Sequence, residues 1–188
     1  IAEGSSAGIT NDSVVTSEKK LRERVSFVIK NFKEPALVER YLAGREFSVA
    51  LLGNPPEVLP IIEADHELLP KKYLPIDSLE VKWLYEEESG GAHLVCPAKM
   101  TNSLRNQIVQ ISLTTFRALG IKDLCRIDIR CDKDENPYVL EVNSPPGLIP
   151  PEVSVTSYFP LAASKSGMDY EALLQKIIEA AEERYGLR

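Results

Sequence analysis

Three side chains with metal-binding chemistry lie in the segment 124–143, LCRIDIRCDKDENPYVLEVN. Apolar and polar residues alternate with a period of two in both halves of this segment, which predicts two strands. Asp128 shares the polar face of the first strand with Arg126, and Glu141 and Asn143 share a face of the second. Carboxylate and amide oxygens are typical ligands of Mg²⁺ or Mn²⁺. This segment is therefore the first candidate for the chemistry of the protein.

The turn between the two predicted strands decides which residues face each other. Residues 132–137, DKDENP, are turn formers, so we expect an antiparallel hairpin. If the turn is centred on the midpoint of this segment, the numbers of facing residues sum to 269. Asp128 then faces Glu141, and Arg126 faces Asn143. In the second strand one side is expected to carry Tyr138, Leu140 and Val142, and the other Val139, Glu141 and Asn143.

Two facing carboxylates need a positive partner. At about 5 Å and an effective dielectric near 20, two such charges repel by roughly 3 kcal/mol. A metal ion between Asp128 and Glu141 would remove this repulsion, and Arg126 on the same face would meet an anion. The residues alone leave a second interpretation open, a solvated face on which Glu141 turns away. A register slip of one residue would move every side chain to the opposite face.

The composition narrows the class of protein. The chain has 188 residues, of which 44% are hydrophobic and 27% charged, so it is globular rather than disordered. A net charge of -6 argues against a nucleic-acid partner, which requires a basic surface. We find neither a signal peptide nor a membrane-length apolar run, and the three cysteines are odd in number and widely spaced. We therefore expect a cytoplasmic protein with reduced thiols and no membrane partner.

The hydrophobic periods elsewhere in the chain alternate between helices and antiparallel hairpins, which predicts an α+β fold. No clear period is found in residues 71–91, so we expect an irregular stretch that serves as a lid or a binding loop. The other expected elements are a helix capped by Ser17 and ending near Asn31, a buried strand at 36–42, a hairpin pairing 47–52 with 58–63, a helix from Asn102 to Leu119, and a final helix capped by Asp169.

Five short motifs along the chain carry a resemblance to a known family. They are Glu3-Gly4-Ser5-Ser6-Ala7-Gly8, Val38-Glu39-Arg40-Tyr41-Leu42 followed by Gly44-Arg45-Glu46-Phe47, Cys96-Pro97-Ala98, Arg126-Ile127-Asp128, and Leu140-Glu141-Val142-Asn143-Ser144-Pro145-Pro146-Gly147. In content and order they resemble those of the D-alanine–D-alanine ligases, members of the ATP-grasp superfamily. The resemblance covers nearly the whole chain, and it implies an α+β ATP-grasp fold that is incomplete at the N-terminus.

The resemblance also implies an ATP site and a phosphoryl-transfer site. The expected nucleotide contacts are Gly4 and Ser6 of the small-residue loop, Glu39, Arg40 and Leu42 beside the adenine, and Glu46 at the ribose hydroxyls. The expected catalytic groups are Lys82 at the terminal phosphate, Arg126 at the transferred phosphoryl group, and Ser5 in the closing loop, the last not as a nucleophile. The expected metal ligands are Asp128, Glu141 and Asn143, and the expected substrate contacts are Gly147 and Ser157. Trp83 replaces a tyrosine of the ligases, so a hydrogen bond to the loop is either lost or replaced.

The implied activity is an ATP-dependent ligation of a carboxylate to an amine through an acyl phosphate, with two Mg²⁺ or Mn²⁺ ions, amino-acid substrates and a possible homodimer. Residues 1–46 would be the end of the central ATP-grasp subdomain, and residues 47–188 the C-terminal subdomain with the metal site. Because the chain opens at the phosphate loop, we expect a fragment that does not turn over alone. The alternative is a non-catalytic module that binds nucleotide and metal.

Overall fold

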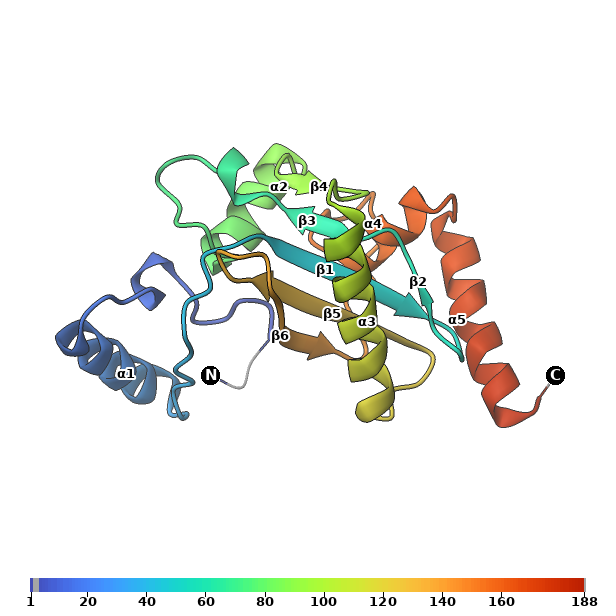
Figure 1. Cartoon of the computed structure of the whole chain (residues 1–188), viewed down its shortest axis with the longest axis horizontal. Helices are drawn as coiled ribbons and strands as arrows, with labels where there is room; N and C mark the ends of the chain where they lie inside the picture. Colours follow the sequence, from blue (N-terminus) through green and yellow to red (C-terminus); the bar gives the residue numbers. More distant parts are fainter. Residues whose placement is uncertain (2–3, 188) are drawn as a thin grey trace.

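The computed structural model describes residues 1 and 4–187. Its centre is an antiparallel sheet in the order β4-β3-β1-β5-β6, with β2 paired to β1 and helices packed on both faces (Figure 1). This arrangement confirms the predicted α+β class. The strands are β1 (Glu46–Leu52), β2 (Glu57–Val58), β3 (Ile62–Ala64), β4 (Leu94–Val95), β5 (Leu124–Cys131) and β6 (Pro137–Asn143).

Two of the three long helices begin directly after the predicted caps Ser17 and Asp169, and the third begins at Asn102, as predicted. The side chains of Ser17, Thr101 and Asp169 each accept a hydrogen bond from a backbone N–H of the first helical turn. Among the described residues, no helix combines the length and the hydropathy needed to cross a membrane. The helices are α1 (Glu18–Phe32), α2 (Glu86–Ser89), α3 (Asn102–Ala118), α4 (Tyr158–Lys165) and α5 (Tyr170–Tyr185), with short turns η1 (Asn11–Ser13), η2 (His66–Leu68) and the π-helix η3 (Val81–Tyr85).

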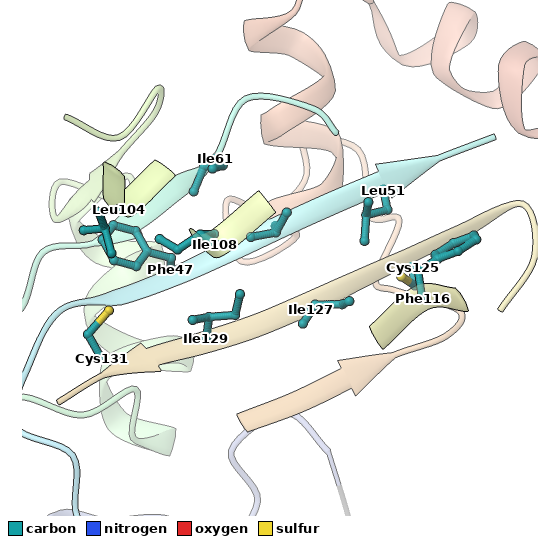
Figure 2. Packing of buried hydrophobic residues seen from close by; sticks show 11 residues of the cluster. Phe47, Leu51, Ile61, Leu104, Ile108, Phe116, Cys125, Ile127, Ile129 and Cys131 are labelled. Carbon is teal, nitrogen blue, oxygen red and sulfur yellow. The ribbon is translucent and has the colours of Figure 1, made fainter. Parts of the chain in front are cut away.

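One face of the sheet is an apolar core covered by α3. Phe47 and Leu51 of β1 and Ile127 of β5 point to the same side, where they meet Ile108 and Phe116 of α3 (Figure 2). These positions alternate along their strands, and every one of them is buried, as the period of two predicts. The opposite face carries a second core under α4 and α5, which covers only one end of the strands. The rest of that face is occupied by charged side chains.

The β5–β6 hairpin confirms the predicted register at one end and departs from it at the other. Asp128 pairs with Glu141 and Arg126 with Asn143, as predicted. Leu140 then has no partner, because Ile129 pairs with Val139. This bulge shifts the rest of β6 by one residue. The prediction was therefore wrong for Val139, which packs on the α3 core, and for its neighbour Tyr138, which pairs with Arg130 of the charged face.

The segment 36–42 is not the buried strand that we predicted. It has no regular structure, and Leu37 is 74% exposed. Both sides of β1 are already paired, to β5 on one side and to β2 and β3 on the other, so this apolar run has no neighbouring strand in the sheet. The chain enters β1 at Gly44, where a Cβ atom would lie 2.2 Å from the carbonyl oxygen of Asp132.

The prediction of an irregular stretch at 71–91 was wrong in part. Residues 72–78 do lack regular structure, but η3 and α2 follow them as one continuous helical segment. The buried side of this segment carries Val81, Lys82 and Glu86. Because two of these three side chains are charged, a search for apolar residues at helical spacing could not detect it.

Candidate active site on the charged face of the sheet

The Asp128 carboxylate lies at the centre of the charged face. Arg126 donates to it from Nε at 2.9 Å and from Nη2 at 2.7 Å, and the Ser48 hydroxyl donates at 2.5 Å from the neighbouring strand. Asn143 donates from Nδ2 at 3.0 Å. Since the amide has one carbonyl oxygen, this bond leaves Oδ1 of Asn143 as a possible cation ligand. The expected partner of Arg126 was an external anion, and in the structure two of its three nitrogens hold Asp128.

Glu141 and the small-residue loop complete this end of the site. Glu141 faces Asp128 in the hairpin, and its Oε1 lies 4.0 Å from the position that a Cβ atom on Gly4 would take. Two facing carboxylates beside an amide oxygen suit a hard cation such as Mg²⁺, which commonly uses one or two carboxylates together with phosphate oxygens. The described residues contain no cluster of three or more His, Cys, Asp or Glu side chains placed to hold a metal. The two carboxylates and the amide oxygen fit a hard cation that takes its remaining ligands from outside the protein.

The loop that begins at Gly4 is fixed by contacts from residues far along the chain. The Ser6 hydroxyl donates to the carbonyl of Asp77 at 2.7 Å, and Trp83 donates from Nε1 to the carbonyl of Ser5 at 3.0 Å. The contact that we expected to be lost or replaced at Trp83 is thus replaced by an indole N–H. Ser5 and Ser6 both have positive φ, which turns the loop sharply. Glu3, the first residue of this motif, lies outside the described residues.

Lys82 and Arg126 contact the same aromatic ring. Lys82 Nζ lies 4.7 Å from the centroid of the Tyr158 ring, and Arg126 Cζ lies 5.5 Å from it. Lys82 also pairs with Asp77, whose Oδ2 is 3.4 Å from Nζ. Both cations are 7% exposed, so they are held in the protein rather than in solvent. The two residues are 44 positions apart in the sequence, and the structure brings both to one ring, where Arg126 also pairs with the predicted metal ligand Asp128.

The hydroxyl of Tyr158 reaches a buried acid. It donates to Glu86, and Glu86 Oε1 is 3.5 Å from Nε2 of His93. Neither Glu86 nor His93 is accessible to solvent. Burial raises the pKa of Glu86 to about 8 and lowers the pKa of His93, so near pH 7 both side chains are held neutral.

The far end of β5 carries a second ion pair, between Arg130 and Glu46. Arg130 donates to the Glu46 carboxylate, to the carbonyl of Leu42 at 3.0 Å and to the carbonyl of Pro75 at 2.7 Å. Burial raises the pKa of Glu46 to about 7, although Arg130 opposes this shift. Burial also lowers the pKa of the adjacent His66 to about 3. Arg130 thus binds two groups, Leu42 and Glu46, that were predicted to contact a nucleotide.

The other predicted nucleotide contacts lie outside this cluster. Glu39 and Arg40 are exposed in the irregular segment before β1, and the Arg40 guanidinium lies 5.7 Å from the Tyr138 ring. A groove of about 730 Å³ opens at the same end of the sheet. Its lining includes Gly44, Arg45, Glu63, His66, Pro75 and Arg130.

The two predicted substrate contacts are neighbours. A Cβ atom on Gly147 would lie 3.3 Å from the Ser157 hydroxyl oxygen, which also accepts a hydrogen bond from the backbone N–H of Ile149 at 3.1 Å. Ser157 directly precedes Tyr158, the residue whose ring both cations contact. The predicted substrate residue Ser157 is therefore next to that ring residue in the chain.

Five residues of this region were not predicted. Ser48 and Arg130 lie on the charged side of their strands, so their spacing could have indicated them. Asp77, Glu86 and Tyr158 carry no such signal, because they come from an irregular segment, a short helix and a helix that we did not predict. Only the packing of these elements brings them to Lys82 and Arg126.

Comparison with known proteins gives one consistent family. A family model described as "D-ala D-ala ligase C-terminus" matches residues 1–179. The uncharacterized protein y4sG of Sinorhizobium fredii is 37% identical over 173 residues, which are 92% of this chain and 48% of that protein. The D-alanine–D-alanine ligase of Pelotomaculum thermopropionicum is 33% identical over 156 residues, covering 81% of this chain and 44% of the relative. The chain thus spans about half the length of these curated relatives.

Solved structures share the fold. The D-alanine–D-alanine ligase of Bacillus anthracis, complexed with ATP, matches 90% of this chain and 48% of its own with a TM-score of 0.67 and 23% identity. The ligase of Coxiella burnetii matches 92% of this chain and 41% of its own with a TM-score of 0.66 and 22% identity. This likeness confirms the ATP-grasp fold that the motifs predicted.

Proposed function

We propose that the protein carrying this chain is an ADP-forming carboxylate–amine ligase. The chain belongs to the D-alanine–D-alanine ligase family, because a model of the C-terminal part of that family matches residues 1–179. The product of the ligase would be an amide of the D-alanyl-D-alanine type, and its substrates would be ATP and amino acids. We further propose that the protein is cytoplasmic and forms a homodimer, and that the division at residues 46 and 47 separates the end of the central subdomain from the C-terminal subdomain.

One observation carries this proposal. Two buried cations, Lys82 and Arg126, lie on one tyrosine ring, and Arg126 pairs with Asp128, which faces Glu141 in the hairpin. Phosphoryl transfer needs positive charge around the equatorial oxygens of the transferred group and little covalent participation from the protein. A module that only bound nucleotide would have no need to bury two phosphate-directed cations next to a cation site.

The proposed reaction has two steps. An oxygen of the substrate carboxylate attacks the terminal phosphorus of ATP, an O–P bond forms, and the bond to the ADP oxygen breaks as ADP leaves with the electron pair. The amine nitrogen of the second substrate then attacks the acyl carbon and loses a proton. A C–N bond forms, and the C–O bond to the phosphoryl group breaks to release inorganic phosphate.

The residues of the charged face divide these tasks. Lys82 would bind the terminal phosphate and Arg126 the transferred phosphoryl group, using the planar geometry of a guanidinium. When bound between Asp128, Glu141 and Asn143, one or two Mg²⁺ or Mn²⁺ ions would supply charge neutralisation for the ATP phosphates. Ser5, with Gly4 and Ser6, would close the loop over these phosphates through its backbone. Gly147 and Ser157 would contact an amino-acid substrate.

At the nucleotide end of the site, Arg130 is an addition to the contacts that the family resemblance implies. We propose that Glu46 binds the ribose hydroxyls, and that Glu39, Arg40 and Leu42 line the adenine. Arg130 already donates to Glu46 and Leu42, so a nucleotide bound there must share these acceptors or displace the guanidinium.

Replacement of Glu141 by Gln in the full-length protein tests the proposal. The amide removes one carboxylate from the cation site at nearly constant size, so metal-dependent phosphate release should fall at least about 100-fold. Glu57→Gln, which alters an exposed acid on β2 of the same sheet, is the matched control and should leave the rate unchanged.

Two other results would count against the assignment. Unchanged turnover in Glu141→Gln would refute the metal site. A full-length protein that binds a non-hydrolysable ATP analogue with metal, yet releases no phosphate with any amino acid, would be the non-catalytic module.

A further inference from the structure

The ring of Tyr158 contacts Lys82 and Arg126, the two cations that we propose to bind phosphate. The ring lies 4.7 Å from Lys82 Nζ and 5.5 Å from Arg126 Cζ, and only 3% of the residue is exposed. A cation within about 6 Å of a ring centroid is attracted by the electron-rich face, more strongly where water is excluded. One ring therefore attracts two cations at a buried site.

Lys82 and Arg126 are both positively charged, so their mutual repulsion must be balanced by attractive contacts. Each has its own acid, since Asp77 lies 3.4 Å from Lys82 and Asp128 is gripped by Arg126 at 2.7 Å. These acids come from different parts of the chain, because Asp77 belongs to the segment before η3 and Asp128 to β5. The Tyr158 ring contacts both cations.

We propose that Tyr158 is a positioning residue of the ligase reaction, whose ring holds Lys82 and Arg126 together for the terminal phosphate of ATP. The inference rests on the proposed function and adds a residue to it. Tyr158 would touch neither substrate nor metal and would act through the two cations.

The hydroxyl of Tyr158 holds the ring in place. This hydroxyl donates to Glu86, which has no access to solvent and lies against His93. The charged and titratable groups that face Glu86 are Asp77, Lys82, Glu87, His93 and Tyr158. Because burial keeps Glu86 in its neutral form near pH 7, it anchors the hydroxyl without adding a negative charge that would compete with phosphate for the cations.

Two substitutions separate the ring from the hydroxyl in the full-length protein. Tyr158→Phe keeps the ring and should retain kcat for phosphate release within about threefold. Tyr158→Leu removes the ring and should lower kcat about 10- to 100-fold, since two cation–ring contacts are lost together. The effect should fall on kcat more than on KM for ATP, because charge on the phosphoryl oxygens is greatest in the transition state. Phe159→Leu is the control for a lost aromatic side chain in the same helix.

A second measurement does not depend on turnover. Acetylation of Lys82 by an amine-reactive reagent, followed by mass spectrometry, reports how firmly the amine is held. Acetylation should be about tenfold faster in Tyr158→Leu than in the wild type, while Tyr158→Phe and Phe159→Leu should match the wild type.

The outcomes distinguish this inference from the proposed function. If the wild type releases phosphate and Tyr158→Leu equals it in kcat and in Lys82 acetylation, the positioning role is refuted. If the wild type is inactive with every amino acid, the ligase function fails, and acetylation alone decides whether the ring holds Lys82. If Tyr158→Leu does not fold, Tyr158→Met fills the same space without a ring and must show the same two changes.

Discussion

Both faces of the sheet are buried, but different interactions stabilise the buried side chains on each face. On β5, Ile127 and Ile129 point into the α3 core and are fully buried, while Arg126 and Arg130 on the other side are 7% and 4% exposed. The α3 face is stabilised by apolar packing. The opposite face is stabilised by pairing each guanidinium with a carboxylate, Arg126 with Asp128 and Arg130 with Glu46.

This difference shows what a period of two can and cannot predict. Alternation correctly separates the two faces of β5, and the simplest interpretation of its polar side is a solvated surface. In the structure the π-helix, α2 and α4 bring Lys82, Glu86 and Tyr158 to that side. Because a buried charge is costly without a partner, this face holds a fixed set of ion pairs that apolar packing alone would not provide.

The largest expected effect is on the apolar face. Phe47→Ala removes a fully buried ring from the α3 core and should lower the free energy of unfolding by about 3–5 kcal/mol. Urea denaturation measures this change. The loss should be similar at pH 5 and pH 9, because the Arg45 guanidinium, 4.9 Å from the centroid of the Phe47 ring, stays charged at both pH values. Phe47→Leu, which keeps most of the apolar volume, should recover most of the stability. A strong pH dependence of the loss would contradict the assignment of this face to apolar packing.

A smaller and pH-dependent effect is expected on the charged face from Arg130→Met. The pKa of Glu46 is raised from 4.5 to about 7, so its carboxyl is mostly neutral in the folded protein at pH 5 and ionised at pH 9. Loss of the guanidinium raises this pKa further, so destabilisation should grow as the pH rises through 7. We expect about 2–3 kcal/mol at pH 9, below the cost of a fully buried pair because the Glu46 side chain is 14% exposed.

The double variant Glu46→Gln/Arg130→Met is the control for this pair. It removes the acid together with its partner, so the extra loss at high pH should disappear. Equal losses in Arg130→Met at pH 5 and pH 9 would show that the carbonyls of Leu42 and Pro75, rather than Glu46, are the important partners of Arg130.

The sequence was sufficient for local features and insufficient for those that depend on packing. The β5–β6 hairpin and the pairing of Asp128 with Glu141 follow from alternation and turn residues. The bulge at Leu140 does not, since an unpaired residue leaves no mark on an apolar–polar pattern. The predicted strand at 36–42 was wrong because strand formation needs a free neighbour, which no local pattern reports.

The site divides in the same way. The residues that we propose for phosphate and metal chemistry, such as Lys82 and Glu141, were predicted from the family resemblance and from the alternation along one hairpin. The residues that hold them in place were missed, because Tyr158 and Asp77 are far from Arg126 in sequence and belong to elements with no apolar period. Arg130 was on the predicted charged face, but its partners Leu42 and Pro75 contribute only backbone carbonyls, which a sequence pattern cannot specify.

The smallest expected effect is at the edge of the charged face, where Trp83 holds the small-residue loop. Trp83→Phe removes the hydrogen bond from Nε1 to the carbonyl of Ser5, and we expect a loss of about 0.5–1.5 kcal/mol in the free energy of unfolding. The indole is 41% exposed, so water can replace part of this bond and the loss should lie near the lower limit. Trp83→Tyr offers a hydroxyl donor in its place and should recover part of it. Proteolysis at the loop, measured against the wild type, should be faster in Trp83→Phe than in Trp83→Tyr. Equal rates in the two variants would mean that packing of the ring, and not its donor, holds the loop against the charged face.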